Sequence, residues 1–142
     1  MKLFCENIID ERIAATKALM NNAQMAANNE GKSSAGDKYE TSRAMSHLEK
    51  DMHARQLMNH LNELAAVRAV KVDIIYSTVV AGAVVECATG TFFISAGLGK
   101  QFVDDVPVIF LSPQSPLAKK MNSRRVGDII SYNGEEKITA IY

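Results

Sequence analysis

Two long stretches of this sequence contain neither proline nor glycine, and they constrain the fold more than any other feature. Residues 7–28 form the first stretch and residues 37–68 form the second. Between them, residues 28–36 are rich in asparagine, serine and glycine, which favour turns. As helices these stretches are long, since the second alone would extend roughly 48 Å at 1.5 Å per residue. This order predicts two antiparallel helices joined by a short turn, a helical hairpin of the coiled-coil type.

The first stretch carries a narrow line of apolar and small residues at alternating steps of four and three. That spacing places them on one side of a helix and predicts a seam against a partner helix. Two alanines at the far end of the line would let the partner approach closely. The predicted seam consists of Ile9, Ile13, Thr16, Met20, Ala23 and Ala27.

The second stretch changes its apolar face along its length when each residue is advanced by 100°. Its first half places Thr41, Met45, Leu48 and Met52 on one face. Its second half gathers its apolar residues on nearly the opposite face, namely Leu57, Met58, Leu61, Leu64 and Ala65. We therefore predict a switch near residue 55, with the first half packed on the first helix and the second half on the N-terminal residues or the following domain. A break in the helix would explain the same pattern.

After residue 70 the composition turns to β-branched and aromatic residues punctuated by glycine and proline, which predicts strands. The expected strands are residues 70–75, 79–87, 91–95, 106–112, 128–132 and 136–142. Asn133-Gly134 is a strong hairpin signal between the last two. Ser115 and Pro116 suit the N-cap and first position of a short helix over residues 115–121. The predicted fold is thus α+β, with a helical hairpin at 1–69, its turn near 29–40, and a mostly antiparallel β domain at 70–142.

Charge and cysteine content exclude several classes of function. Lys plus Arg and Asp plus Glu both number 16, so the chain lacks the overall basic bias of a protein that coats nucleic acid. Cys5 and Cys87 have neither the spacing of a zinc site nor that of a disulfide scaffold. No signal peptide is recognised and no apolar run reaches the roughly 20 residues that span a bilayer. We expect reduced thiols, a cytoplasmic protein and no membrane association.

Two separate segments point to a family. Ser115-Pro116-Leu117-Ala118-Lys119-Lys120-Met121 with Arg124-Arg125-Val126-Gly127-Asp128 resembles the helix-and-strand signature of the Gre transcript-cleavage factors of bacterial RNA polymerase. Gly36-Asp37-Lys38-Tyr39-Glu40 is similar to the Gly-Asp-x-x-Glu that these factors carry at the end of their coiled coil. The order of the parts agrees with this family over essentially the whole chain. The resemblance implies an FKBP-like C-terminal domain and a coiled coil that enters the secondary channel of RNA polymerase.

The resemblance also implies roles for individual residues. Asp37 would ligate or position a Mg²⁺ ion that is shared with RNA polymerase and not stably bound by this chain alone, and Glu40 would orient a water. Phosphodiester hydrolysis in a two-metal site supports this, because a weakly held Mg²⁺ needs further carboxylate ligands. The polymerase would remain the enzyme. Contacts with polymerase or with the RNA 3′ end would come from basic and aromatic residues, namely Lys38, Tyr39, Arg43, Lys119, Arg124 and Arg125.

Several alternatives remain open from the sequence. Asp37-x-x-Glu40 is also a capping-box pattern, Tyr39 could cover the helix start, and the basic residues could form solvated helix faces. Where the family usually has Asn, an acidic residue and Tyr after the tip Glu, this chain has Thr41 to Ala44. A channel binder that regulates polymerase without cleavage is therefore a second hypothesis. A prolyl isomerase or chaperone and a plain coiled-coil adaptor are others. The oligomeric state is open, with a monomer favoured, and the spacing of the three histidines does not indicate a metal site.

Overall fold

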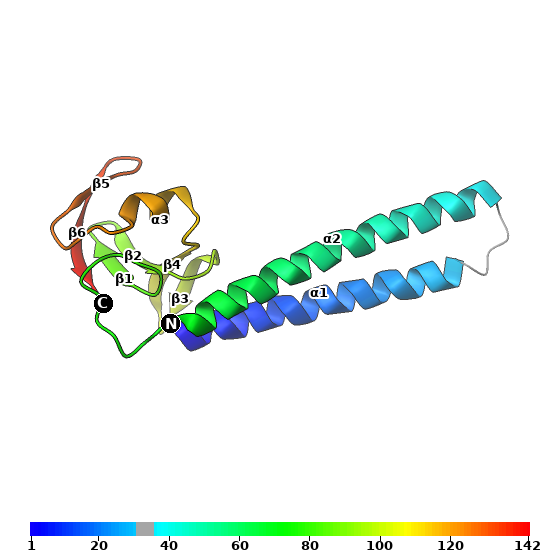
Figure 1. The fold of residues 1–142 in the computed structure, drawn as a ribbon, viewed down its shortest axis with the longest axis horizontal. Coiled ribbons are helices and arrows are strands. Elements are labelled where there is room, and N and C mark those ends of the chain that lie inside the picture. The colour runs from blue at the N-terminus through cyan, green and yellow to red at the C-terminus, as the bar shows by residue number, and fades with distance from the viewer. Residues whose placement is uncertain (31–35) are drawn as a thin grey trace. The chain divides into compact units, whose positions relative to one another are not determined.

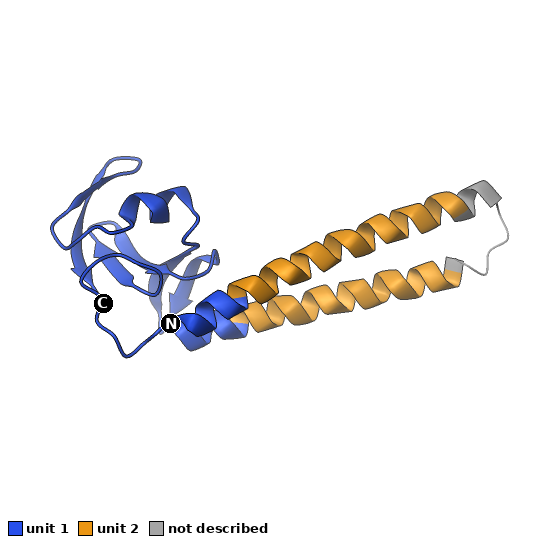
Figure 2. Cartoon of the chain, viewed as in Figure 1, with its two compact units in different colours: residues 1–7, 64–142 blue, residues 8–63 orange. Residues whose placement is uncertain are grey.

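A computed structural model describes residues 1–30 and 36–142 (Figure 1), with side chains described for all of these except residues 30 and 36–39. The chain divides into two compact units, coloured separately in Figure 2. We name residues 8–63 the hairpin unit, and residues 1–7 together with 64–142 the β unit. Two N-terminal helices precede a mostly antiparallel sheet with one short helix, so the predicted α+β class is confirmed. The predicted division into domains at residue 70 stays a prediction.

The two long helices are α1, Lys2–Glu30, and α2, Gly36–Ala69, and they run antiparallel as expected (Figure 1). Within the described residues, neither helix is apolar enough to cross a membrane. The predicted seam of α1 is confirmed, because its members are all buried or half-buried. The Lys50 ammonium donates a 3.0 Å hydrogen bond to Gln24 Oε1 and thereby joins α2 to α1. Small and apolar side chains at steps of three and four therefore hold the hairpin together.

The face switch that the sequence predicts near residue 55 is wrong. Met45, Leu48 and Met52 are exposed and do not pack on α1. A different side of α2 is covered, and it forms one continuous line along the helix. The side chains on this line are mostly polar or small in the first half of α2 and mostly apolar in the second half. This line consists of Ser42, Ser46, His53, Leu57, His60, Leu64 and Val67. Because α2 is one uninterrupted helix, its covered residues follow a single face along its length.

The β unit contains one six-stranded sheet in the order β3-β4-β2-β1-β6-β5. All neighbouring pairs are antiparallel except β2 and β4, which run parallel. The strands are β1 Val84–Cys87, β2 Gly90–Ile94, β3 Gly99–Val103, β4 Val106–Leu111, β5 Ile129–Ser131 and β6 Glu135–Ile141. Five of the six predicted strand segments thus contain a strand, and the Asn133-Gly134 turn joins β5 to β6 as predicted.

Two strand predictions fail. The predicted strand 70–75 is irregular, and its Val72, Ile74 and Ile75 are exposed. β-branched residues extend a chain, but a strand also needs a neighbour to accept its backbone hydrogen bonds, and this segment pairs with none of the six strands in the described residues. The strand β3 was not predicted. It is joined to β4 by Asp104 and Asp105, both at positive φ (50° and 64°), the geometry of a tight two-residue hairpin turn.

One face of the sheet packs against α3, Pro116–Met121, as predicted for the segment 115–121. The Ser115 hydroxyl accepts a 3.2 Å hydrogen bond from the Ala118 amide and caps the helix. Between helix and sheet lies the main hydrophobic core. It consists of Val79, Ala83, Val85, Cys87, Phe92, Ile94, Ala118, Met121, Ile130, Ile138 and Ile141. This core fixes α3, which carries Lys119, and the segment after it, which carries Arg124 and Arg125.

The first turns of α1 belong to the β unit. The Phe4 ring stacks on Phe110 with centroids 5.7 Å apart, and Phe93 meets Phe110 edge-on at 5.6 Å. Cys5 Sγ lies 3.5 Å from Ser95 Oγ. Lys2 Nζ donates to the carbonyls of Arg68 and Val70, each at 2.8 Å, and so satisfies acceptors at the end of α2. The start of α1 and the end of α2 are therefore fastened together in this unit.

Candidate functional site

The residues with the strongest predicted role lie at the start of α2. Because α2 begins at Gly36, Asp37 is its second residue and Glu40 follows one turn later. Residues three apart on a helix lie on the same side. Glu40 is exposed. The side chains of Asp37, Lys38 and Tyr39 lie outside the described part of the chain, as do residues 31–35 of the predicted turn.

Two carboxylates at the start of a helix can provide part of the coordination shell of a divalent cation. The amino end of a helix carries a partial positive charge that stabilises nearby anions, which favours the carboxylate of Glu40 in the first turns of α2. Mg²⁺ prefers carboxylate oxygens and six ligands in all, so two such residues fit part of its shell but cannot complete it. In the part of the chain that the structure describes, no three His, Cys, Asp or Glu residues gather as a metal site. An ion bound at Asp37 and Glu40 would need ligands from a partner.

Of the predicted basic contacts, Arg43 lies on α2 and is exposed, whereas Lys119, Arg124 and Arg125 lie in the β unit and are also exposed. The backbone below the last two is well held. Val79 N donates to Arg124 O at 2.9 Å, and the Arg125 amide donates to Asp128 Oδ2 at 2.9 Å. Arg43 is therefore carried by a helix of the hairpin unit, and Arg124 and Arg125 by hydrogen-bonded backbone of the β unit.

Lys120 is occupied differently from its neighbours. Its ammonium donates a 2.9 Å hydrogen bond to Ser131 O and lies 5.7 Å from the centroid of the Tyr132 ring. These contacts fasten α3 to β5 and the turn that follows it. Lys120 therefore serves the β unit itself, while Lys119 extends into solvent.

A cavity of about 290 Å³ lies beside α3 in the β unit. Its lining is mainly apolar and includes two aromatic rings, Phe92 and Tyr132. The remaining lining residues are Thr89, Ile109, Leu117, Met121, Ile130, Asn133 and Glu136. Thr89 donates a hydrogen bond to the Glu136 carboxylate at its rim. The isomerase or chaperone hypothesis comes from the FKBP-like character that the resemblance implies for this domain, and it stays a prediction.

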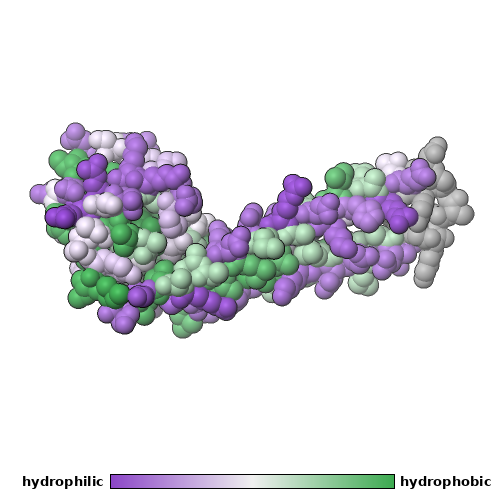
Figure 3. Space-filling view, in the orientation of Figure 1, coloured by the Kyte–Doolittle hydropathy of each residue, from purple (hydrophilic) through white to green (hydrophobic). Residues whose placement is uncertain are grey.

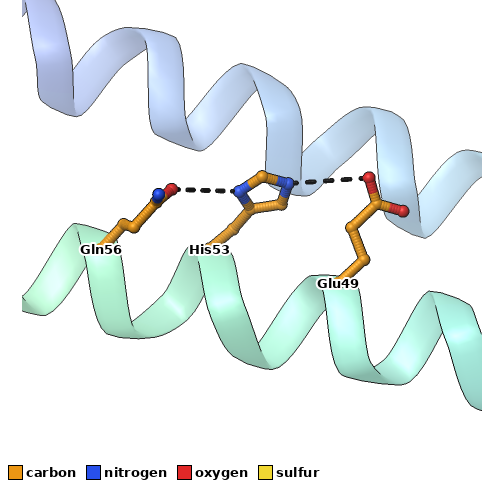
Figure 4. A network of polar contacts seen from close by, with 3 residues as sticks. All are labelled: Glu49, His53 and Gln56. Atoms are coloured by element: carbon orange, nitrogen blue, oxygen red, sulfur yellow. Dashed lines mark hydrogen bonds and ion pairs between the residues drawn. The ribbon is translucent and has the colours of Figure 1, made fainter.

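His53 is a residue whose position the sequence reading missed. It is 6% exposed and lies in the seam of the hairpin. Figure 4 shows its ring between two neighbours on α2: Nδ1 lies 3.3 Å from Gln56 Oε1, and Nε2 lies 3.8 Å from Glu49 Oε1. Counting back from Leu64 by steps of four and three reaches His53, so the spacing carried this signal. The ring fills the seam, and among residues 1–30 and 36–142, as far as their side chains are described, it belongs to no group of metal-ligating residues.

The two thiols are free and buried. Burial raises the pKa of the Cys5 thiol. Burial, with a smaller contribution from the Glu136 carboxylate, raises the pKa of the Cys87 thiol to about 11. Since the thiolate is the reactive form, neither side chain is prepared for nucleophilic or redox chemistry at neutral pH.

The chain was also compared with known proteins. No protein-family model matches it, and no curated protein matches it. Among solved structures that are similar, one described as "Structure of the transcription factor Gfh1" covers 96% of this chain and 92% of its own, at 17% sequence identity and a TM-score of 0.41. Similarity at this level establishes neither family nor function, so the functional proposal rests on the residues of this chain.

Proposed function

We propose that this protein is a transcription elongation factor that binds RNA polymerase and stimulates the polymerase's own cleavage of backtracked RNA. The observation that carries the proposal is the segment Gly36 to Glu40, which resembles the acidic tip of Gre factors and opens the second helix of a helical hairpin. Glu40 is exposed there. The resemblance of residues 115–128 to the same family supports the proposal independently.

In this proposal Asp37 and Glu40 supply two carboxylates for a Mg²⁺ ion, and the polymerase supplies the remaining ligands. Asp37 holds or positions the ion, and Glu40 accepts a hydrogen bond from the attacking water and so orients it. Bound Mg²⁺ supplies a Lewis acid for phosphodiester hydrolysis. Lys38, Tyr39 and Arg43 contact the RNA 3′ end or the channel, and Lys119, Arg124 and Arg125 form a second contact with polymerase.

The test uses purified bacterial RNA polymerase stalled by backtracking on a template with 3′-labelled RNA. We expect the wild-type protein and Mg²⁺ to release short 3′ RNA fragments. Asp37→Asn removes a charge with little change in shape, so it should abolish release while binding to polymerase persists. Asp10→Asn is the matched control, because Asp10 is an exposed carboxylate on α1. Normal fragment release by both Asp37→Asn and Glu40→Gln would rule out the metal role.

A second candidate is a channel binder that regulates transcription without cleavage. It is favoured by Thr41, Ser42, Arg43 and Ala44, which replace the Asn, acidic residue and Tyr that usually follow the family's tip Glu. On this alternative the protein would slow elongation without releasing fragments, and Asp37→Asn would leave its effect unchanged. The same stalled-complex assay, run beside a single-round elongation assay, separates the two candidates.

A further inference from the structure

Three large apolar side chains on α2 lie in solvent along one line. Met45 is 65% exposed, Leu48 70% and Met52 51%. They are spaced by three and four residues, so they form a continuous strip over about two turns of the helix. We name them the exposed stripe. Figure 3 shows that hydrophobic patches interrupt the mostly hydrophilic surface of the hairpin.

The hairpin does not need the exposed stripe for its own stability. The opposing face of α1 is covered by a different side of α2, on which His53 is buried and Ser42 and Ser46 are half-buried. Single exposed apolar residues are ordinary on protein surfaces, but several in line are a mark of an interaction site. The stripe therefore consists of apolar residues that neither pack in the seam nor are favoured by contact with solvent.

The charges beside the stripe indicate what it would meet. Glu49 follows Met45 by four residues and precedes Met52 by three, and Asp51 follows Leu48 by three, so exposed carboxylates border the stripe on both sides. Arg55 ends the line three residues after Met52. An acidic border favours a partner with basic side chains around an apolar patch. It disfavours RNA or DNA, whose phosphates these carboxylates would repel.

The small size of the stripe argues against a second copy of this chain. A stable interface buries about 800 Å² on each partner, far more than three side chains offer. In an antiparallel pairing about Leu48, moreover, Glu49 would approach its own counterpart. A partner that encloses the hairpin on several sides can bury the stripe together with other contacts.

We propose that the exposed stripe docks on the wall of the RNA polymerase channel, at an apolar patch bordered by basic side chains. This inference rests on the proposed function and names the contact that would hold the hairpin in place. The stripe begins five residues after Glu40, so its docking would fix how far the acidic tip enters. Its role is in positioning and affinity, not in the chemistry at Asp37 and Glu40.

The test measures binding of fluorescently labelled full-length protein to purified core RNA polymerase, with wild type, Leu48→Gln and Leu61→Gln compared. Leu61 is the matched control, because it is the same residue on the same helix, 42% exposed and far from the stripe around the helix axis. Losing one buried leucine should weaken binding about tenfold, whereas Leu61→Gln should bind like wild type. Both variants should keep the wild-type circular dichroism, since both side chains are exposed.

Each outcome distinguishes this inference from the function on which it rests. If the wild-type protein binds polymerase and Leu48→Gln binds with the same affinity, the docking role is overturned and the proposed function stands. No binding by wild type would overturn both. Sedimentation showing a wild-type dimer that Leu48→Gln converts to monomer would assign the stripe to a second copy and overturn the inference. Asp51→Asn should reduce the salt dependence of binding, and tighter binding by that variant would refute the basic character of the partner surface.

Discussion

The contact between Phe4 and Phe110 gives a quantitative test of how α1 is fastened to the sheet. Phe4 is half-buried, Phe110 is 1% exposed, and their ring centroids are 5.7 Å apart. Replacing a fully buried phenylalanine by alanine costs about 3–5 kcal/mol, so we expect Phe4→Ala to lower the free energy of unfolding by about 2 kcal/mol. For a chain of this size that corresponds to a fall in Tm of roughly 7 °C. The ring pair itself should contribute about 0.5–1.5 kcal/mol of this as a coupling energy.

The assay is urea and thermal unfolding followed by circular dichroism, with Phe4→Ala, Phe110→Ala and the double variant forming a double-mutant cycle. Leu3→Ala is the control, because Leu3 is adjacent to Phe4 on the same helix but 69% exposed. It should change stability by less than about 0.5 kcal/mol. If Phe4→Ala were no more destabilising than Leu3→Ala, the first turn of α1 would not be part of the β unit.

Three further expectations concern the same unit, each measured by urea unfolding. Ser115→Ala should cost about 1 kcal/mol through loss of the helix cap, and an unchanged midpoint would contradict the capping bond to the Ala118 amide. Lys2→Met should cost about 1 kcal/mol by leaving two carbonyls at the end of α2 without their donor; a cost that vanished only in high salt would instead indicate a purely electrostatic role. Because burial raises the pKa of the Cys87 thiol from 9.0 to about 11, the folded state binds this proton more tightly than the unfolded state, and the free energy of unfolding should fall as the pH rises from 9 to 11. Cys87→Ser should make this fall smaller. If the variant and the wild type lost the same stability between pH 9 and 11, Cys87 would not be the group responsible.

Sequence reasoning worked best where one local signal sufficed. The turn-forming residues between two uninterrupted helical stretches predicted the hairpin, and the steps of four and three from Ile9 to Ala27 predicted the seam of α1. Ser115 followed by Pro116 predicted the start of α3, because capping and a fixed φ depend only on neighbouring residues. Asn133-Gly134 predicted a turn for the same reason. These signals need no knowledge of distant parts of the chain.

The failures share a different cause, namely that the outcome depends on a partner element. Val72, Ile74 and Ile75 favour an extended chain but pair with no strand in the part of the chain that the structure describes, so residues 70–75 are irregular. The strand β3 contains Gly99, Lys100 and Gln101, which are poor strand formers by composition, yet its pairing with β4 fixes it. The side chains of Asp37, Lys38 and Tyr39 remain predictions, because they lie outside the described residues. The roles of Arg43, Lys119, Arg124 and Arg125 likewise depend on a partner.

The exposed stripe follows from the continuity of α2, which is one uninterrupted helix from Gly36 to Ala69. Rotating this helix to bury Met45, Leu48 and Met52 against α1 would be favourable locally, since they would replace serines in the seam. A continuous helix turns as one body, however, so the same rotation would carry Leu57, Leu64 and Val67 out of their places, and the last two are at most 6% exposed. It would also move the Arg68 carbonyl away from the Lys2 ammonium. The apolar residues in the second half of α2 therefore determine which face the helix buries, and the stripe is left exposed. Places where a sequence breaks its own hydrophobic pattern are often functional, which is why this stripe, rather than the better-hidden seam, is where we look for a partner.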